Sequence, residues 1–153
     1  MYQHFVEHYN EIFIFDHHIF ERLRPYSKPQ GKAVDLGSGT GRLTHVLQRL
    51  DMMACGVDMD LSMIEHARRD FPQLIFHHDN LVNFLANHRQ FDLMTCFGNT
   101  LAHLDVEDLK RFFKYARQSL SDDGYLIIQL LNYEKILRDK PAHLKTLEFT
   151  NGR

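Results

Sequence analysis

The clearest chemical pattern lies between Asp35 and Gly41, in the segment Asp-Leu-Gly-Ser-Gly-Thr-Gly. A short apolar run at 33–36 contains the acid, three glycines follow at alternate positions, and an amphipathic helix is predicted from Arg42. This order predicts a strand, a tight turn and a helix N-terminus, where α/β proteins bind nucleotide-like ligands. Glycine lets the backbone approach a ligand closely, so we expect N–H groups of the turn and of the following helix to face that ligand.

The spacing of the glycines separates two kinds of ligand. A dinucleotide-binding turn has the spacing G-x-G-x-x-G, but its third glycine would fall where this chain has Arg42. The turn here has the spacing D-x-G-x-G-x-G instead. A turn that uses glycine only for backbone geometry is the alternative for a lone motif of this kind, so the residues downstream decide.

An acid follows the second predicted strand. Asp58 closes the apolar run at 52–57 and lies about 20 positions after Gly37, the spacing of an acid that accepts hydrogen bonds from ribose hydroxyls. Capping of the next helix is the alternative role, but Asp60 stands immediately before that helix and suits it better. We therefore assign Asp58 to a ribose and Asp60 to the cap.

A second acid follows the third strand at a similar interval. Asp79 can accept a hydrogen bond from an adenine amino group, with Leu81 packed against the ring. The alternative is ordinary, because an Asp79-Asn80 pair before a helix is also a typical cap.

The fourth predicted strand, 91–97, is followed by Gly98-Asn99-Thr100 and then by His103-Leu104. Together with the glycine turn and the segment Val57-Asp58-Met59-Asp60, this pattern resembles the class I S-adenosylmethionine-dependent methyltransferases, in particular the glycine/sarcosine N-methyltransferase-like group. The resemblance covers nearly the whole chain. It implies a Rossmann-like fold, S-adenosylmethionine as cofactor, and S-adenosylhomocysteine as product.

The resemblance also implies the cofactor contacts. Tyr9 lies in a segment similar to the family's N-terminal lid helix, and Tyr9 and Phe97 are candidates for cation–π contact with the sulfonium, whereas Phe13 suits a core position better. The full set of implied cofactor-binding residues is Tyr9, Asp35, Gly37, Ser38, Gly39, Thr40, Asp58, Met59, Asp79, Asn80, Leu81 and Phe97.

Two residues are candidates for the methyl-transfer step. His103 is the candidate general base, because imidazole accepts a proton near neutral pH, and a surface or capping histidine is its alternative. Asn99 is the candidate to orient the acceptor or to contact the methionine moiety. DNA amino-methyltransferases have Asn/Asp-Pro-Pro-Tyr at this place, whereas this chain has Phe-Gly-Asn-Thr, so we expect a small polar metabolite as acceptor rather than DNA.

A scaffold must bring these strand ends together. Five apolar runs alternate with helical segments, which predicts an α/β fold with a doubly wound parallel sheet covered on both faces. The runs are at 33–36, 52–57, 73–77, 91–97 and 124–131, and the main helical segments at 42–50, 61–69, 81–87 and 106–120. We expect one domain, with an N-terminal helical lid at 1–31 and a cofactor-binding unit at 32–153.

The C-terminal part departs from the family. The family's sheet has seven strands and ends in an antiparallel pair, whereas the tail after Leu131 holds at most one further strand, at 145–150. The last strands are therefore expected to be missing or incomplete, which leaves the fifth strand as an apolar edge. Two expectations follow: a homodimer through that edge, and, as an alternative function, a cofactor-binding module without catalysis.

Composition excludes several other classes. The net charge is −2 with no basic patch, which argues against a nucleic-acid partner, and no apolar run approaches the roughly 20 residues that span a membrane. The eleven histidines form no metal-ligand spacing, so no metal is expected. Cys55 and Cys96 are expected to be free thiols in a cytoplasmic protein. A nicotinamide-dependent oxidoreductase is a third function, and Arg42 counts against it.

Overall fold

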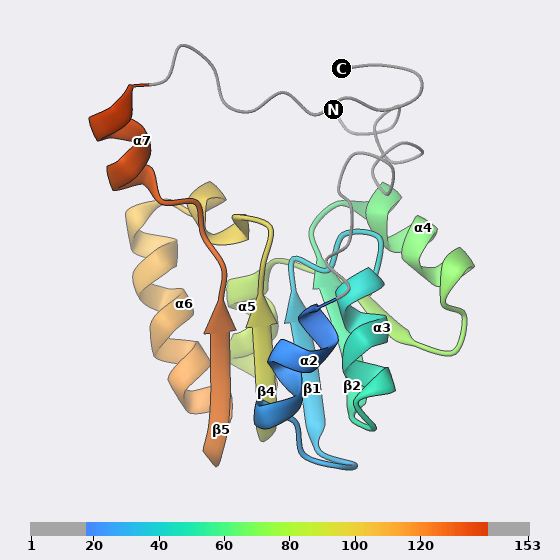
Figure 1. Cartoon of the computed structure of the whole chain (residues 1–153). Coiled ribbons are helices and arrows are strands. Elements are labelled where there is room, and N and C mark those ends of the chain that lie inside the picture. The colour runs from blue at the N-terminus through green and yellow to red at the C-terminus, as the bar shows by residue number, and fades with distance from the viewer. Residues whose placement is uncertain (1–17, 141–153) are drawn as a thin grey trace.

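The structure, a computed structural model, describes residues 18–140 (Figure 1). The expectations for Tyr9, Phe13, most of the lid and the strand at 145–150 lie outside the described residues. Five strands form one sheet: β1 (Lys32–Leu36), β2 (Met53–Asp58), β3 (Ile75–His78), β4 (Phe91–Cys96) and β5 (Leu120–Ile128).

Helical segments connect the strands. The longer ones are α3 (Arg42–Arg49), α4 (Leu61–Asp70), α5 (Leu81–Asn87), α6 (Val106–Ser119) and α7 (Tyr133–Asp139). Three short ones are α2 (Ile19–Leu23) and the 3-10 turns η1 (Arg24–Tyr26) and η2 (Thr100–His103).

The sheet has the strand order β3-β2-β1-β4-β5, and every neighbouring pair is parallel. The order reverses direction between β1 and β4, and ligands of such sheets bind outside the carboxyl ends of the strands at this switch point. The predicted doubly wound parallel sheet is therefore confirmed for five strands.

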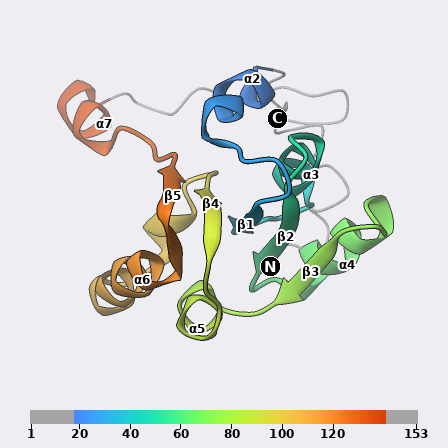
Figure 2. The ribbon, with the colours of Figure 1, turned by 90° about the horizontal axis from the view of Figure 1, so that it is seen from below.

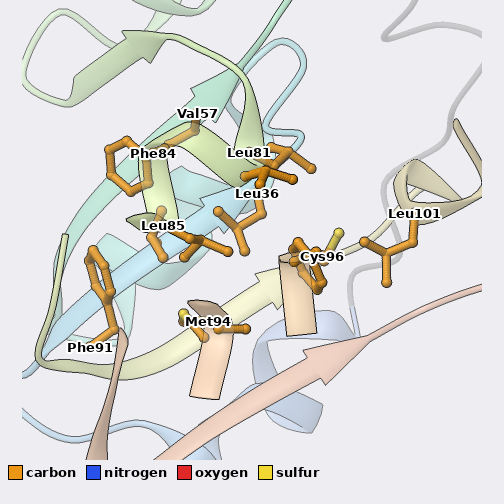
Figure 3. Close-up of a cluster of buried hydrophobic side chains, with 13 residues drawn as sticks. Leu36, Val57, Leu81, Phe84, Leu85, Phe91, Met94, Cys96 and Leu101 are labelled. Atoms are coloured by element: carbon orange, nitrogen blue, oxygen red, sulfur yellow. The ribbon is translucent and has the colours of Figure 1, made fainter. Parts of the chain in front are cut away.

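Helices cover both faces of the sheet, as the apolar strands predict (Figure 2). Alternate residues of β1 point in opposite directions: Ala33 joins a core with α2 and α3, while Val34 and Leu36 join a core with α5 and α6. Figure 3 shows the second core running along the sheet from Phe91 to Leu101. Leu101 anchors η2, so this core also supports the loop that follows β4.

The described part of the predicted lid packs against the sheet. Leu23 of α2 is 1% exposed and shares a core cluster with Ala33 and Leu47. The pair Arg24-Pro25 then begins η1, where proline suits the first turn because it lacks an N–H. A lid function for residues 1–31 remains a prediction.

The boundary between α6 and β5 differs from the sequence prediction, which continued the helix through Leu120 and began the strand at Gly124. The helix ends one residue earlier, at Ser119, whose buried hydroxyl lies 2.9 Å from the carbonyl oxygen of Leu85 and 2.8 Å from that of His88. Leu120 is already extended and pairs with Phe91, and a register irregularity near the start of β4 absorbs the extra residues.

The edge position predicted for β5 is confirmed in the described part of the chain, where β5 pairs only with β4. Tyr125 of β5 is 51% exposed and has its ring edge-on against Tyr26 at a centroid distance of 5.2 Å. The outer edge of β5 is unpaired in the described part of the chain, and an unpaired strand edge favours pairing with another chain.

Removing the Phe84 side chain should destabilise the fold strongly. Phe84 is 1% exposed at the centre of the core beneath α5, so Phe84→Ala should lower the free energy of unfolding by about 3–5 kcal/mol. Urea unfolding followed by circular dichroism measures this change. Phe113→Ala is the matched control, because Phe113 is 47% exposed on α6 and should cost less than about 1 kcal/mol.

Candidate cofactor and acceptor site

The glycine turn after β1 donates its N–H groups to β2. The N–H groups of Gly37 and Ser38 donate to the carbonyl oxygen of Val57 at 2.8 and 2.9 Å, and that of Gly39 donates to Asp58 Oδ2 at 2.8 Å. For these three N–H groups the expectation that they face a ligand is wrong, whereas for the N–H groups of the following helix it stays a prediction.

Two glycines of the turn are required by their neighbours as well as by the backbone. Gly37 and Gly41 have φ values of +81° and +83°, in the left-handed region that L side chains rarely adopt. A Cβ at Gly37 would overlap the side chain of Thr100, and one at Gly41 would lie 2.6 Å from Phe76 Cζ. The turn therefore packs directly against the loop after β4 and the side chain of a β3 residue.

Asp35 lies beneath the turn instead of facing outward. It is 2% exposed, and its two carboxylate oxygens accept hydrogen bonds from Thr95 Oγ1 at 3.0 Å and Thr44 Oγ1 at 3.1 Å. Thr95 is its register partner on β4, and Thr44 comes from the first turn of α3. Burial raises the pKa of Asp35 to about 7 against the lowering effect of these hydroxyls, and the nearby Asp58 adds to the rise. Direct cofactor contact by Asp35 remains a prediction.

Asp58 and Asp60 divide their roles after β2. Asp60 caps α4, because its carboxylate accepts from the N–H groups of Ser62 at 2.8 Å and Met63 at 3.4 Å. Asp58 accepts from the N–H groups of Gly39 and Asp60, one on each oxygen. Each oxygen keeps a further lone pair, so the carboxylate can still accept from a ligand diol. Burial raises the pKa of Asp58 against these hydrogen bonds, while the Ser62 hydroxyl lowers the pKa of Asp60.

The pair after β3 shows the same division. Asn80 caps α5, because its side-chain oxygen accepts from the N–H of Val82 at 2.8 Å. The Asp79 carboxylate accepts from the N–H of Asn80 at 2.7 Å, and the Asp79 N–H donates to the carbonyl of Asp58 at 3.0 Å. Capping therefore does not require Asp79, which leaves its carboxylate available for a base amino group. Leu81 is buried beside it.

The loop after β4 is tied to the segment after β5. Asn99, with a left-handed φ of 66°, donates from Nδ2 to the Tyr133 hydroxyl at 2.5 Å and accepts from the N–H of Leu131 at 3.3 Å. The N–H of Gly98 donates to Gln129 Oε1 at 2.9 Å. The Asn99 side chain thus joins two loops, and its predicted contact with an acceptor or the methionine moiety stays a prediction.

The remaining predicted residues lie around the same strand ends. Ser38 and Thr40 are buried in the turn, and Ser38 Oγ is a buried polar atom without a hydrogen-bond partner in the described structure. Met59 is 69% exposed, Phe97 packs partly against the core beside α2, and His103 is exposed in η2. The four loops that hold the predicted residues follow β1, β2, β3 and β4 at one edge of the sheet.

Sequence reasoning missed the residues that support the site from below. Thr44 and Thr95 hold Asp35, Thr100 packs against Gly37, and Tyr133 holds Asn99. Thr100 belongs to the Gly98-Asn99-Thr100 segment, but the sequence does not show these contacts, because each of the four residues meets its partner only through the fold.

Both cysteines of the chain are free. Burial, with Asp35 as a second cause, raises the pKa of the Cys55 and Cys96 thiols to about 12, so they stay protonated and unreactive. Between residues 18 and 140, no group of three or more His, Cys, Asp or Glu side chains is arranged to hold a metal. No helix in that part of the chain is long and apolar enough to cross a membrane.

Replacing Asp35 with an isosteric amide should remove a pH dependence of stability. The folded chain holds the Asp35 proton more tightly than the unfolded chain, so its contribution is complete below about pH 4 and is lost as the pH rises toward 7. Wild-type stability should therefore fall by about 2–3 kcal/mol between pH 5 and pH 7 relative to Asp35→Asn. Chemical denaturation at several pH values measures both chains, and parallel curves would contradict the assignment.

Comparison with known proteins identifies a family. Residues 33–124 match the model of the methyltransferase domain family. A search of curated proteins finds no match.

Solved structures share the fold. An S-adenosylmethionine-dependent methyltransferase from Clostridium acetobutylicum is 25% identical with a TM-score of 0.73, over 90% of this chain and 61% of that one. A Pyrococcus horikoshii protein is 21% identical with a TM-score of 0.72, over 94% and 73%. The sugar N-methyltransferase KedS8 from a Streptoalloteichus species is 23% identical with a TM-score of 0.65, over 86% and 53%.

The chain thus spans between about half and three quarters of the length of these three proteins. The family match covers most of the described sheet, and the glycine turn and the acid after β2 lie inside it. The chain therefore belongs to the methyltransferase domain family, the class I S-adenosylmethionine-dependent methyltransferases, whose cofactor is S-adenosylmethionine.

Proposed function

We propose that this chain transfers the methyl group of S-adenosylmethionine to an amino group of a small polar metabolite. The observation that carries the proposal is the meeting of the glycine turn, Asp58 and Asp79 at one edge of the sheet, with the turn N–H groups already used inside the protein. The glycine spacing of a dinucleotide-binding turn is absent, because Arg42 stands where its third glycine would fall.

The chain's residues fit this cofactor. Asp58 keeps acceptor capacity for the two ribose hydroxyls, and Asp79 can accept from the adenine amino group while Leu81 packs on the ring. Ser38 Oγ, which has no partner in the described structure, is a candidate donor or acceptor toward the methionine part. Gly37 and Gly39 leave the turn without side chains where the ligand must approach.

The bound cofactor supplies a methyl group on a positively charged sulfur. The chain's own task is to hold an acceptor in line with that methyl group and to exclude water, and alignment of this kind contributes up to roughly 7–11 kcal/mol of barrier lowering. In our proposal, His103 accepts the proton that the acceptor amine loses. Asn99 acts as a positioning residue. Its amide holds Tyr133 and the chain after β5 next to the loop after β4, where the acceptor would bind.

The choice of an amine follows from two considerations. The neighbour KedS8 is a sugar N-methyltransferase, which supports an amino group on a small polar molecule as the first class to test. The loop after β4 reads Phe97-Gly98-Asn99-Thr100, without the Pro-Pro-Tyr of DNA amino-methyltransferases. An acceptor with several hydroxyl groups would suit the polar surroundings of η2.

A second candidate is a cofactor-binding module without catalysis. It is favoured by the exposed position of the proposed base, His103, in η2. The two candidates share the cofactor site and differ only in whether methyl transfer follows binding.

Replacing Asp58 should weaken cofactor binding. Asp58→Asn keeps the size of the side chain and removes its charge, so affinity for S-adenosylmethionine should fall about 10- to 100-fold in calorimetric titration. Asp123→Asn is the matched control, an exposed acid on β5 whose loss should leave affinity unchanged. Equal affinities for wild type and Asp58→Asn, in samples with unaltered melting curves, would contradict the ribose assignment.

Replacing His103 should slow methyl transfer without weakening cofactor binding. A panel of primary amines and amino sugars, with release of S-adenosylhomocysteine as the readout, identifies an acceptor. With that acceptor, His103→Gln should reduce kcat about 100-fold. An unchanged kcat would remove His103 as the base. A folded chain that binds the cofactor but transfers methyl to no member of the panel would favour the binding module.

We also propose a cytoplasmic homodimer that pairs through β5. The buried free thiols support a reducing compartment, and the exposed β5 edge supports the pairing. Sedimentation velocity should show a dimer for the wild type and a monomer for Tyr125→Lys, which places a charge on the edge. A monomeric wild type would contradict the proposed dimer.

A further inference from the structure

A hollow of about 540 Å³ lies at the end of the sheet opposite the glycine turn. Lys32, Met53 and Ile75 all line it, and each is the first residue of its strand, β1, β2 or β3. Because the strands are parallel, their first residues share the edge that is farthest from the predicted cofactor site.

The hollow exists because α5 is short. The helix ends at Asn87, so it does not cover the first residues of β2 and β3 on its face of the sheet. Met53 and Ile75 are 55% and 64% exposed there, although both are large apolar side chains within strands. Phe84 and Phe91, which Figure 3 labels, close the inner wall with their rings 6.2 Å apart. The lining is therefore apolar where a ligand body would rest.

An aromatic stack adds a flat surface to this wall. The rings of Phe84 and His88 lie parallel at 3.9 Å with an interplanar angle of 11°, and His77 lies 5.1 Å from Phe84. His88 is fixed further, because its Nδ1 lies 2.8 Å from the carbonyl oxygen of Phe84. Burial, together with His88 and Arg68, lowers the pKa of His77, which favours a neutral ring.

The charges around the hollow have one sign. Lys32 and Arg89 line it, and no aspartate or glutamate does. Arg89 is held in place by hydrogen bonds from Nη1 to the carbonyl oxygens of Leu85 and His88. Asp92 accepts from the N–H of Lys32 at 2.9 Å but does not line the hollow, and it is already paired with Lys28. An anion would therefore meet two cations and no lining carboxylate.

We propose that this hollow is a second ligand site, separate from the cofactor site, that binds a small amphipathic carboxylate. The aromatic or aliphatic body lies against Phe84, Phe91 and Ile75, and the carboxylate meets Lys32 and Arg89. A volume of about 540 Å³ has room for a single- or double-ring acid. The site is independent of the proposed methyl transfer and stands if the acceptor assignment fails.

The test uses 4-phenylbutyrate as the probe and 4-phenylbutyramide as an uncharged analogue of nearly the same shape. Both are titrated into the full ¹⁵N-labelled chain, saturated with S-adenosylhomocysteine so that the cofactor site is blocked. The acid should shift the amide signals of residues near 53, 75 and 88. The affinity of the amide should be at least about fivefold lower than that of the acid, because the amide lacks roughly one exposed charge contact.

Two variants locate the ligand. Ile75→Glu places a negative charge in the hollow at an exposed position and should lower the affinity for the acid about tenfold. Lys32→Gln should lower this affinity about threefold. Lys110→Gln is the matched control, because it removes the same charge from the exposed face of α6. Equal binding of acid and amide, shifts centred on the glycine turn, or no shifts at millimolar probe would each overturn the proposal.

Discussion

The hydrogen bonds from the glycine turn to the end of β2 are the constraint on which the rest of the site depends. Three consecutive N–H groups of the turn donate to the Val57 carbonyl and the Asp58 carboxylate. They fix the distance between β1 and β2 where the strands end, and they leave Asp58 facing the switch point with acceptor capacity to spare. The same bonds tie the turn to the end of β2, so one set of bonds both shapes the turn and positions Asp58.

A buried carboxyl group supports the turn from beneath. Asp35 accepts from two threonine hydroxyls, one on the neighbouring strand and one on α3, so it links three elements under the site. Burying a carboxyl group costs its hydration, and the fold tolerates this because both oxygens of Asp35 have hydrogen-bond partners. Thr100, from the loop after β4 on the other side of the switch point, packs against Gly37, where any side chain would collide with it. The turn is therefore held from below and from the side.

The two ends of the sheet have opposite character. Acidic residues and the glycine turn lie at the carboxyl ends of the strands. Apolar side chains and cations lie around a hollow at the amino ends of β1, β2 and β3. The α5-side core that supports η2 through Leu101 also contains Phe84 and Phe91 beside the hollow. One packed layer thus lies behind both sites. The β5 edge and the Asn99–Tyr133 contact mark a third region, where the chain after the sheet is tied to the loop after β4.

The sequence by itself determined the parallel sheet, the place of the glycine turn and the helix caps, because apolar runs, glycine spacing and Asp or Asn before a helix act over a few residues. Asp60 caps α4 as predicted. Tertiary structure alone decided what the turn N–H groups bind, since Val57 lies far along the chain from Gly37. The same holds for the burial of Asp35 under Thr44 and Thr95, and for Asn99, whose partner is Tyr133. Each depends on which strands become neighbours, and short-range patterns do not encode strand order.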